Sequence, residues 1–253
     1  MIIIKSSKEI ELMREGGKIL AEVMECLGEA VFPGNNTFEI NKLAKELILK
    51  AKGVPIFEGY GDKKNPYPAA VCISVNNEIV HGIPRKEKIL QIGDIVKLDI
   101  GILYKGMITD MARTYPVGKI SNEAQKLIET TKEALNAGIK IIKAGMKLND
   151  YGRVVEKYAK SNGFSVVYDL VGHGVGKKLH EDPFIPNYPV KLVESVFREN
   201  MTVALEPMIN VGTRYIKLMP DGWTYATKDG KLSAHFEDTI VVKKNGVEIL
   251  TRI

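Results

Sequence analysis

The sequence is poor in cysteine and has no long apolar run. Its 253 residues include two cysteines, Cys26 and Cys72, which excludes the disulfide framework of a small secreted domain. No stretch reaches the roughly 18 consecutive apolar residues of a membrane-spanning helix. The opening MIIIKSSKEIELM lacks the basic start, apolar middle and cleavage site of a secretory signal. We therefore expect a cytoplasmic protein without a membrane segment.

Charge of one sign is not in large excess. The chain has 36 basic and 31 acidic residues, a formal net charge of +5. Lysines are spread along amphipathic segments, and no basic stripe is interleaved with aromatic residues. This pattern indicates solvated faces and no specific nucleic-acid site, although transient attraction to an RNA-rich partner such as the ribosome stays open. We expect a monomer.

Four segments have apolar residues at the spacing of an amphipathic helix. The first begins near Ser6, because Ser6 and Glu9 have the spacing of a capping box, and Pro33-Gly34 ends it. The other three are expected at about 37–52, 121–143 and 149–162.

The remaining apolar runs predict β-strands, and the order of elements repeats. Strands are expected at 70–75, 95–103, 107–116, 166–170, 202–211 and 233–242. Ala144-Gly145 precedes the fourth helix as Pro33-Gly34 precedes the second, which indicates one domain, 1–253, of two pseudo-repeat halves, about 1–118 and 119–253. The alternative is that any helical hairpin shows such glycines. We predict an α+β fold in which two pairs of helices cover an antiparallel sheet.

Asp99 and Asp110 lie on either side of a predicted hairpin turn. If Tyr104-Lys105 forms the loop, Asp99 lies opposite Asp110 and both carboxylates share one face of the sheet. Like charges facing each other repel, and a cation between them would remove that cost. The alternative is a pair of solvent-facing aspartates.

Two of the four histidines have glycine as a direct neighbour. His173 lies between Gly172 and Gly174, and His81 precedes Gly82. Such glycines leave an imidazole accessible to a ligand, so we expect a site, although a lone histidine is often structural. His180 follows soon after His173.

Two glutamates interrupt apolar strand sequence. Glu206 lies in Val203–Met208 and Glu237 in Ala234–Val241, and a buried carboxylate needs a partner or a metal ion. The alternative is an outward face on each strand. Strand alternation directs His235 toward the same face as Glu237, just outside the ligands, and Asp238 toward the other.

Taken together, these groups form an oxygen-rich set of four carboxylates and one histidine. Such a set suits two divalent ions, Co, Mn, Fe or Zn, better than a structural zinc, which prefers cysteine and histidine. The metal ligands predicted are Asp99, Asp110, His173, Glu206 and Glu237.

The order and spacing of these motifs resemble the type I methionine aminopeptidases, the bacterial short form with the duplicated "pita-bread" fold. The resemblance covers nearly the whole chain. It rests on residues 74–84, both aspartates, residues 172–176 and 180–183, Glu206-Pro207-Met208, and Asp221-Gly222-Trp223 leading to Glu237.

The resemblance implies an enzyme that releases the initiator methionine of nascent chains with a small second residue. It implies that Asp110 and Glu237 bridge two metal ions, that Asp99 chelates one, and that His173 and Glu206 hold the other. Further roles are implied for the remaining site residues: His81 and His180 at the scissile peptide, Glu206 in proton transfer, and Cys72, Tyr60, Tyr67 and Trp223 around the methionine side chain. Leu170, Leu179 and Asp238 depart from the family's usual residues, and the loop 61–66 is longer.

Two other functions compete with this one. A prolidase or aminopeptidase P on the same fold would cut before proline, and activity on Xaa-Pro peptides would separate it. A non-catalytic binding protein could keep the fold and lose the chemistry, but it would be expected to lack ligands, and all five are present.

Overall fold

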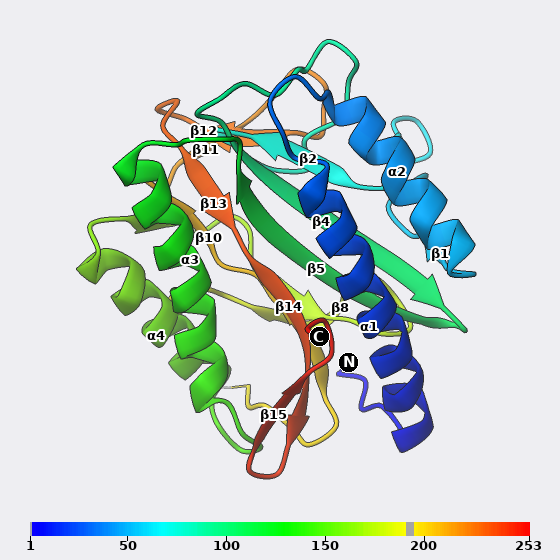
Figure 1. Ribbon diagram of the computed structural model, residues 1–253. Helices are drawn as coiled ribbons and strands as arrows, with labels where there is room; N and C mark the ends of the chain where they lie inside the picture. Colours follow the sequence, from blue (N-terminus) through cyan, green and yellow to red (C-terminus); the bar gives the residue numbers. More distant parts are fainter. Residues whose placement is uncertain (1, 191–194) are drawn as a thin grey trace.

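The computed structural model describes residues 2–190 and 195–253. Within them four helices cover an antiparallel sheet (Figure 1). They are α1 (Ser7–Glu29), α2 (Thr37–Lys50), α3 (Asn122–Ile141) and α4 (Leu148–Ser161). All four predicted helices are confirmed, with ends shifted by a few residues. None of the described helices is long and apolar enough to cross a membrane.

Side-chain caps explain where three of the helices begin. The Ser6 side chain accepts a hydrogen bond from the Glu9 N–H, and the Glu9 carboxylate accepts one from the Ser6 N–H at 2.8 Å, so the predicted capping box is confirmed. Asn36 caps α2 and Ser121 caps α3 in the same position. These residues satisfy backbone N–H groups that a helix leaves free at its start.

The main sheet has nine antiparallel strands. Seven of them follow one another in the order β1 (Val54–Pro55), β4 (Ile95–Tyr104), β5 (Met107–Pro116), β14 (Glu237–Lys243), β9 (Thr202–Leu205), β7 (Gly172–Gly174) and β8 (Glu181–Ile185). The other two are β2 (Cys72–Val75), which pairs with β4, and β15 (Gly246–Ile249), which pairs with β14.

Two three-stranded sheets complete the architecture. One consists of β13 (Ser233–His235), β10 (Met208–Asn210) and β6 (Ser165–Val166), and the other of β11 (Ile216–Leu218), β12 (Tyr225–Thr227) and β3 (Glu78–Val80).

Several strand predictions were wrong in extent. The run 202–211 is interrupted at Glu206-Pro207, because proline has no N–H for the sheet ladder. The run 233–242 is interrupted at Phe236, whose N–H points to the carbonyl of Pro207 at 3.5 Å. Of the run 166–170, only Val166 lies in a strand, β6 (Ser165–Val166). The interruptions let one continuous sequence contribute to two sheets.

The β4–β5 register differs from the prediction. Lys105 and Gly106 form the turn, with φ of 48° and 86°, because a two-residue hairpin turn of this kind needs left-handed backbone at both positions. Asp99 therefore pairs with Ala112, and Asp110 pairs with Gly101. The two aspartates are diagonal neighbours and still share one face of the sheet.

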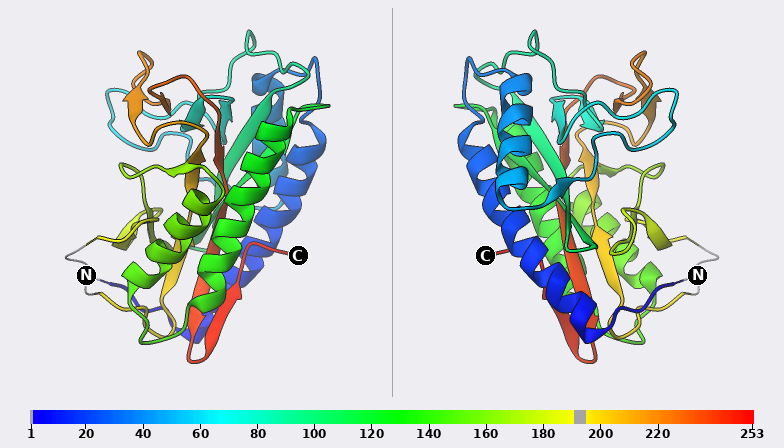
Figure 2. Two further views of the ribbon diagram at one scale, coloured as in Figure 1. Left: turned by 90° about the vertical axis from the view of Figure 1, so that its left-hand side faces the viewer. Right: turned by 90° about the vertical axis from the view of Figure 1, so that its right-hand side faces the viewer.

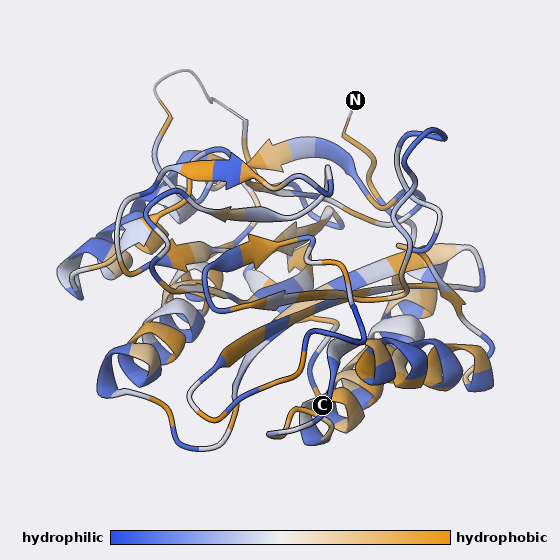
Figure 3. Ribbon diagram, turned by 90° about the horizontal axis from the view of Figure 1, so that it is seen from above, coloured by the Kyte–Doolittle hydropathy of each residue, from blue (hydrophilic) through white to orange (hydrophobic). Residues whose placement is uncertain are grey.

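The helices lie in pairs over the two halves of the sheet. Helices α1 and α2 pack on the β4–β5 side, and α3 and α4 pack over β6, β10 and β13. In Figure 2 helices α1 and α3 lie on one side of the molecule, with the orange β11–β12 region on the opposite side. Figure 3 shows orange, apolar residues along the central strands and blue residues in the outer loops. Strands β5 and β14 pair where the halves meet.

Candidate metal centre

Five neighbouring strands each bring one metal-binding group to the same region. In the sheet order β4, β5, β14, β9 and β7, these groups are Asp99, Asp110, Glu237, Glu206 directly after β9, and His173. All five line a cavity of about 430 Å³. The structure thus brings together the five residues that were predicted as ligands from the sequence, although they lie up to 138 positions apart in the chain.

Short distances connect the members of this cluster. His173 Nε2 lies 3.4 Å from Glu206 Oε1. Ligand atoms of Asp110, His173 and Glu237 lie within 4.8 Å of one another, and so do those of Glu206, His235 and Glu237. Distances of this size let neighbouring groups bind a common cation.

Three of the four carboxylates have an oxygen without a partner within the described residues. Within the described residues, one oxygen each of Asp99, Asp110 and Glu237 is buried without a hydrogen bond. Burial raises the pKa of Asp99 to about 7 and that of Glu206 to about 8. Burial, and then the charge of neighbouring carboxylates, raises the pKa of Asp110 and of Glu237 as well. Three buried acids, with the partly buried Glu206 beside them and no Lys or Arg ion pair to any of the four in the part of the chain that the structure describes, fit the presence of divalent cations, which satisfy those oxygens.

His173 has the tautomer that a metal ligand needs. Its Nδ1–H donates to the carbonyl of Gly174 at 3.0 Å, which leaves the lone pair of Nε2 facing Glu206. Burial, with the neighbouring His180, lowers the pKa of His173 to about 3, so the ring is neutral at ordinary pH. A neutral imidazole is the form that binds metals.

His235 reaches the cluster by a different route from the one predicted. The strand is interrupted at Phe236, so His235 belongs to β13 and Glu237 to β14, in separate sheets. Alternation along one strand was therefore the wrong reason to expect His235 beside Glu237. The His235 ring nevertheless faces the cluster, with Nε2 at 3.5 Å from Glu206 Oε2. The alternation argument held for Asp238, whose buried carboxylate binds Arg113, Arg252 and Thr251 away from the cavity.

His180 lies beside the cluster, against Tyr60. The Tyr60 hydroxyl is 2.5 Å from His180 Nδ1, and the His180 ring centroid is 4.3 Å from that of His173. With Nδ1 engaged, Nε2 is the ring nitrogen left for another partner. Burial lowers the pKa of His180 and keeps it neutral.

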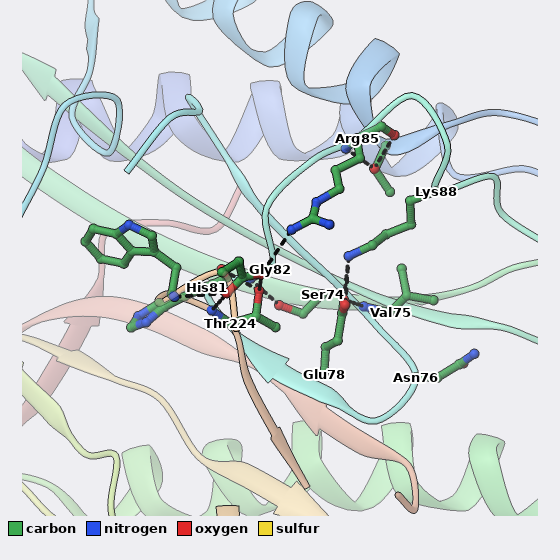
Figure 4. A network of polar contacts seen from close by, with 12 residues as sticks. Ser74, Val75, Asn76, Glu78, His81, Gly82, Arg85, Lys88 and Thr224 are labelled. Carbon is green, nitrogen blue, oxygen red and sulfur yellow. Dashed lines mark hydrogen bonds and ion pairs between the residues drawn. The ribbon is translucent and has the colours of Figure 1, made fainter. Parts of the chain in front are cut away.

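His81 is held in a strained turn. Its φ of 58° is left-handed, which is unusual for a residue other than glycine. The Thr224 hydroxyl donates to the His81 carbonyl at 3.4 Å, and the Gly82 N–H donates to the Ser74 side chain at 3.0 Å (Figure 4). Arg85 also lies in this network. Backbone strain of this kind persists where surrounding contacts impose it, and it is common at functional sites.

The wall beside the histidines is apolar and aromatic. Cys72 lies directly across the sheet from Asp99, and burial raises the pKa of its thiol, so it stays neutral. The rings of Tyr67 and Trp223 meet edge to face with centroids 5.3 Å apart. All of the predicted pocket residues line the cavity: Tyr60, Tyr67, Cys72, His81, His180 and Trp223.

Sequence reasoning missed part of the cavity lining. Phe57, Val80, Val171 and Phe184 also line it, and Leu170 and Leu179 stand there as well. No sequence signal marks the first four, because an apolar residue in a strand-like run looks the same whether it faces a core or a cavity.

Comparison with known proteins identifies the family. The sequence model for metallopeptidase family M24 matches residues 11–244. The chain belongs to metallopeptidase family M24. It is 46% identical to a methionine aminopeptidase of Clostridium perfringens over 100% of both sequences. A crystal structure of a methionine aminopeptidase from Thermotoga maritima matches with a TM-score of 0.96 at 43% identity, again over 100% of both chains.

These findings confirm the pita-bread fold and a metal-dependent peptidase of the methionine aminopeptidase type. An Xaa-Pro dipeptidase from Bacillus anthracis matches with a TM-score of 0.80 at 23% identity, and the chain covers 62% of it. That similarity shows a common fold only. The family match and the carboxylate–histidine cluster together indicate divalent metal ions as cofactors, without identifying the element.

Proposed function

We propose that this member of the M24 family removes the N-terminal methionine from proteins and peptides whose second residue is small. The observation that carries the proposal is the convergence of five ligand residues, one from each of five adjacent strands, beside an apolar cavity. Full-length similarity to methionine aminopeptidases supports the choice of methionine.

The ligand set that we propose holds two ions. Asp110 and Glu237 would serve both ions, Asp99 would bind one, and His173 and Glu206 would bind the other. When bound, the ions would supply Lewis acidity toward the scissile carbonyl and toward water. The identity of the ions, Co, Mn, Fe or Zn, is decided by reconstitution, because this ligand set accepts several elements.

Residues of the chain carry the proton transfers. Glu206, which lines the cavity beside the other ligands, takes the proton of the attacking water and delivers it to the leaving amine. His180 donates from Nε2 to the carbonyl oxygen of the substrate, and His81 contacts the scissile peptide from the opposite wall.

The methionine side chain is bound by the apolar wall. Cys72, Tyr67 and Trp223 form a polarisable surface for a thioether, and sulfur–aromatic contacts favour this pairing. Tyr60 covers the pocket from the side of His180. His235 supports Glu206 from outside the ligand set.

We also propose the cellular setting. Cys26 is exposed and Cys72 buried, and both are free, which fits a reducing cytoplasm. All proposed site residues come from one chain, which fits a monomer. The net charge of +5 fits transient contact with ribosomes, on whose nascent chains the enzyme would act. Sedimentation with and without ribosomes tests both points.

A metal-reconstitution assay tests the activity. Chelator-treated enzyme receives Mn, Co, Fe or Zn and is offered peptides beginning Met-Ala, Met-Lys and Xaa-Pro. We expect methionine release from the Met-Ala peptide alone. This activity should be lost in Asp110→Ala and kept in Asp150→Asn, which changes a partly exposed residue of α4 and serves as the control. Cleavage of Xaa-Pro peptides would transfer the protein to the prolidases. Metal binding without any hydrolysis would favour a binding protein.

A further inference from the structure

The first residues of the chain are attached to the second half of the molecule before α1 begins. The Lys5 N–H donates to the carbonyl of Asn200 at 3.1 Å, and Ile4 forms a β-bridge with Met201. Figure 2 shows the start of the chain leaving α1 toward the yellow-green segments of the second half. The N-terminal segment, residues 2–6, is therefore part of the packed structure.

Lys5 is buried and forms an ion pair. Its side chain is among the largest fully buried ones, and Nζ binds the carboxylate of Glu181, with both side chains 1% exposed. Glu181 also accepts the backbone N–H groups of Lys177 at 2.6 Å and Lys178 at 3.0 Å. One carboxylate thus joins the N-terminal segment to both ends of a loop, residues 176–181.

Gly176 gives Lys5 the room to reach this position. A Cβ atom at Gly176 would lie 2.3 Å from Lys5 Cε, far closer than two carbon atoms can approach. The Gly176 carbonyl accepts the N–H of Ile108 on β5, so the start of the loop is also attached to the strand that carries Asp110.

The loop ends at a residue of the proposed site. His180 directly precedes Glu181, so anchoring the Glu181 side chain restrains the peptide unit that carries the His180 ring. Ile3 and His180 also line one small cavity of about 280 Å³. The N-terminal segment therefore lies next to His180 as well as being bonded to its loop.

Stability alone does not account for a buried lysine–glutamate pair. The cost of removing two charges from water often exceeds their attraction, and apolar replacements of similar size are frequently as stable. Such a pair also fixes the relative position of the two segments that carry it, because each buried charge needs the other as its partner. Here this constraint determines the position of a loop ending at His180.

We propose that Lys5 is a positioning residue for His180: its ion pair with Glu181 holds loop 176–181 so that the His180 ring faces the carbonyl of the bound substrate. The proposal rests on the proposed peptidase function. It assigns to the first residues of the chain, remote from the ligands in sequence, an effect on turnover.

Kinetics of Lys5→Met and of the double variant Lys5→Met/Glu181→Gln, which keeps an oxygen for the N–H groups of Lys177 and Lys178, test the proposal in metal-loaded enzyme. In both variants we expect kcat on a Met-Ala peptide to fall by about 10- to 100-fold, because a misplaced His180 loses part or all of its effect as one oxyanion donor. KM and metal content should stay near those of the wild type. The double variant removes the unpaired buried charge, so its Tm should recover while its kcat stays low. Lys160→Met, which breaks the surface pair with Glu156, is the matched control and should change neither.

A spectroscopic measurement is independent of turnover. The imidazole NMR signals of His180 in zinc-loaded enzyme are assigned by their loss in His180→Ala. Both Lys5 variants should shift or broaden these signals, whereas the surface control Lys160→Met should leave them unchanged. The proposal is overturned if a folded Lys5 variant keeps both the His180 signals and kcat, or if the double variant regains kcat together with its Tm. If the wild type releases no methionine, the proposed function fails, and the His180 signals still decide the role of Lys5.

Discussion

At the scale of single residues, the cluster depends on carboxyl groups that are unfavourable without a cation. Glu237 is 2% exposed, one of its oxygens has no partner within the described residues, and the charges of four other acids, Asp110, Glu206, Asp99 and Asp238, act on it. Each buried charge of this kind lowers the stability of the metal-free protein and raises its affinity for a cation.

Glu237→Gln should therefore have opposite effects on metal binding and on metal-free stability. We expect metal affinity to fall by more than about 100-fold, because changes to partners outside a ligand set already cost about 10- to 100-fold. The metal-free variant should unfold at a higher urea concentration than the metal-free wild type, since a neutral amide replaces a repelled carboxyl. Calorimetric titration and urea unfolding measure the two effects. A variant that binds metal normally would remove Glu237 from the ligand set.

His180→Ala should reduce turnover and leave metal binding intact. We expect kcat to fall by on the order of 10²-fold through the loss of one donor to the developing oxyanion. Metal content by mass spectrometry or atomic absorption should match that of the wild type, because His180 is not among the proposed ligands. Unchanged kcat with full metal content would show that His180 has no such role.

At the scale of elements, the β4–β5 hairpin places Asp99 and Asp110 as diagonal neighbours on one face of the sheet, and its turn depends on left-handed backbone. A Cβ atom on Gly106 would meet nothing within 4 Å, so substitution there tests the backbone alone. Gly106 has a φ of 86°, a conformation that costs other residues about 1–2 kcal/mol.

Gly106→Ala should destabilise the protein by about 1–2 kcal/mol with no steric clash. Lys105→Asn is the control: asparagine tolerates left-handed backbone, and the exposed pair of Lys105 with Glu15 contributes little. Urea unfolding of metal-loaded protein measures both. Equal stability of wild type and Gly106→Ala would mean that the turn adjusts its conformation at no cost.

At the scale of the whole molecule, the site lies where the two halves of the chain meet. Asp110 is on β5 of the first half and Glu237 begins β14 of the second, and these strands pair directly. We propose that residues 1–118 and 119–253 are duplicated halves of one domain that unfolds as a unit. Coincident unfolding transitions by Trp223 fluorescence and by far-ultraviolet circular dichroism would support this proposal.

The stability of the metal-free protein should fall as pH rises above about 7. The pKa of Asp99 is about 7 and that of Glu206 about 8 when folded, whereas unfolded carboxyls titrate near 4. The folded carboxyls therefore hold more protons than the unfolded ones up to about pH 8, whereas the buried His81, His173 and His235, with a folded pKa of about 3 to 4, hold fewer protons than unfolded histidines below about pH 6.5. Above about pH 7 only the carboxyl effect remains, and there stability decreases by at most about 1.4 kcal/mol per pH unit for each group.

Thermal unfolding at pH 7, 7.5 and 8 checks this expectation. The Tm of the metal-free protein should decrease steadily, and saturating metal should remove most of the decrease, because the cation replaces the protons. A metal-free Tm that rises over this range would contradict the raised pKa values.

The sequence by itself determined the helices and which residues we propose as ligands. Helix starts follow from local signals, such as Ser6 and Glu9, that need no distant contact. The choice of proposed ligands follows from chemistry: Glu206 and Glu237 are charged residues in apolar runs, and the motifs around them match one family in order and spacing. These properties belong to short segments, which is why they can be recognised without a structure.

Only the tertiary structure decided register, strand breaks and long-range pairs. The turn at Lys105-Gly106 shifts Asp110 opposite Gly101, and Phe236 separates His235 from Glu237 into different sheets. Lys5 and Glu181 are 176 positions apart, and nothing near either residue indicates the other. Such features depend on how distant segments meet and how buried charges are balanced, and those energies exist only once the chain is folded.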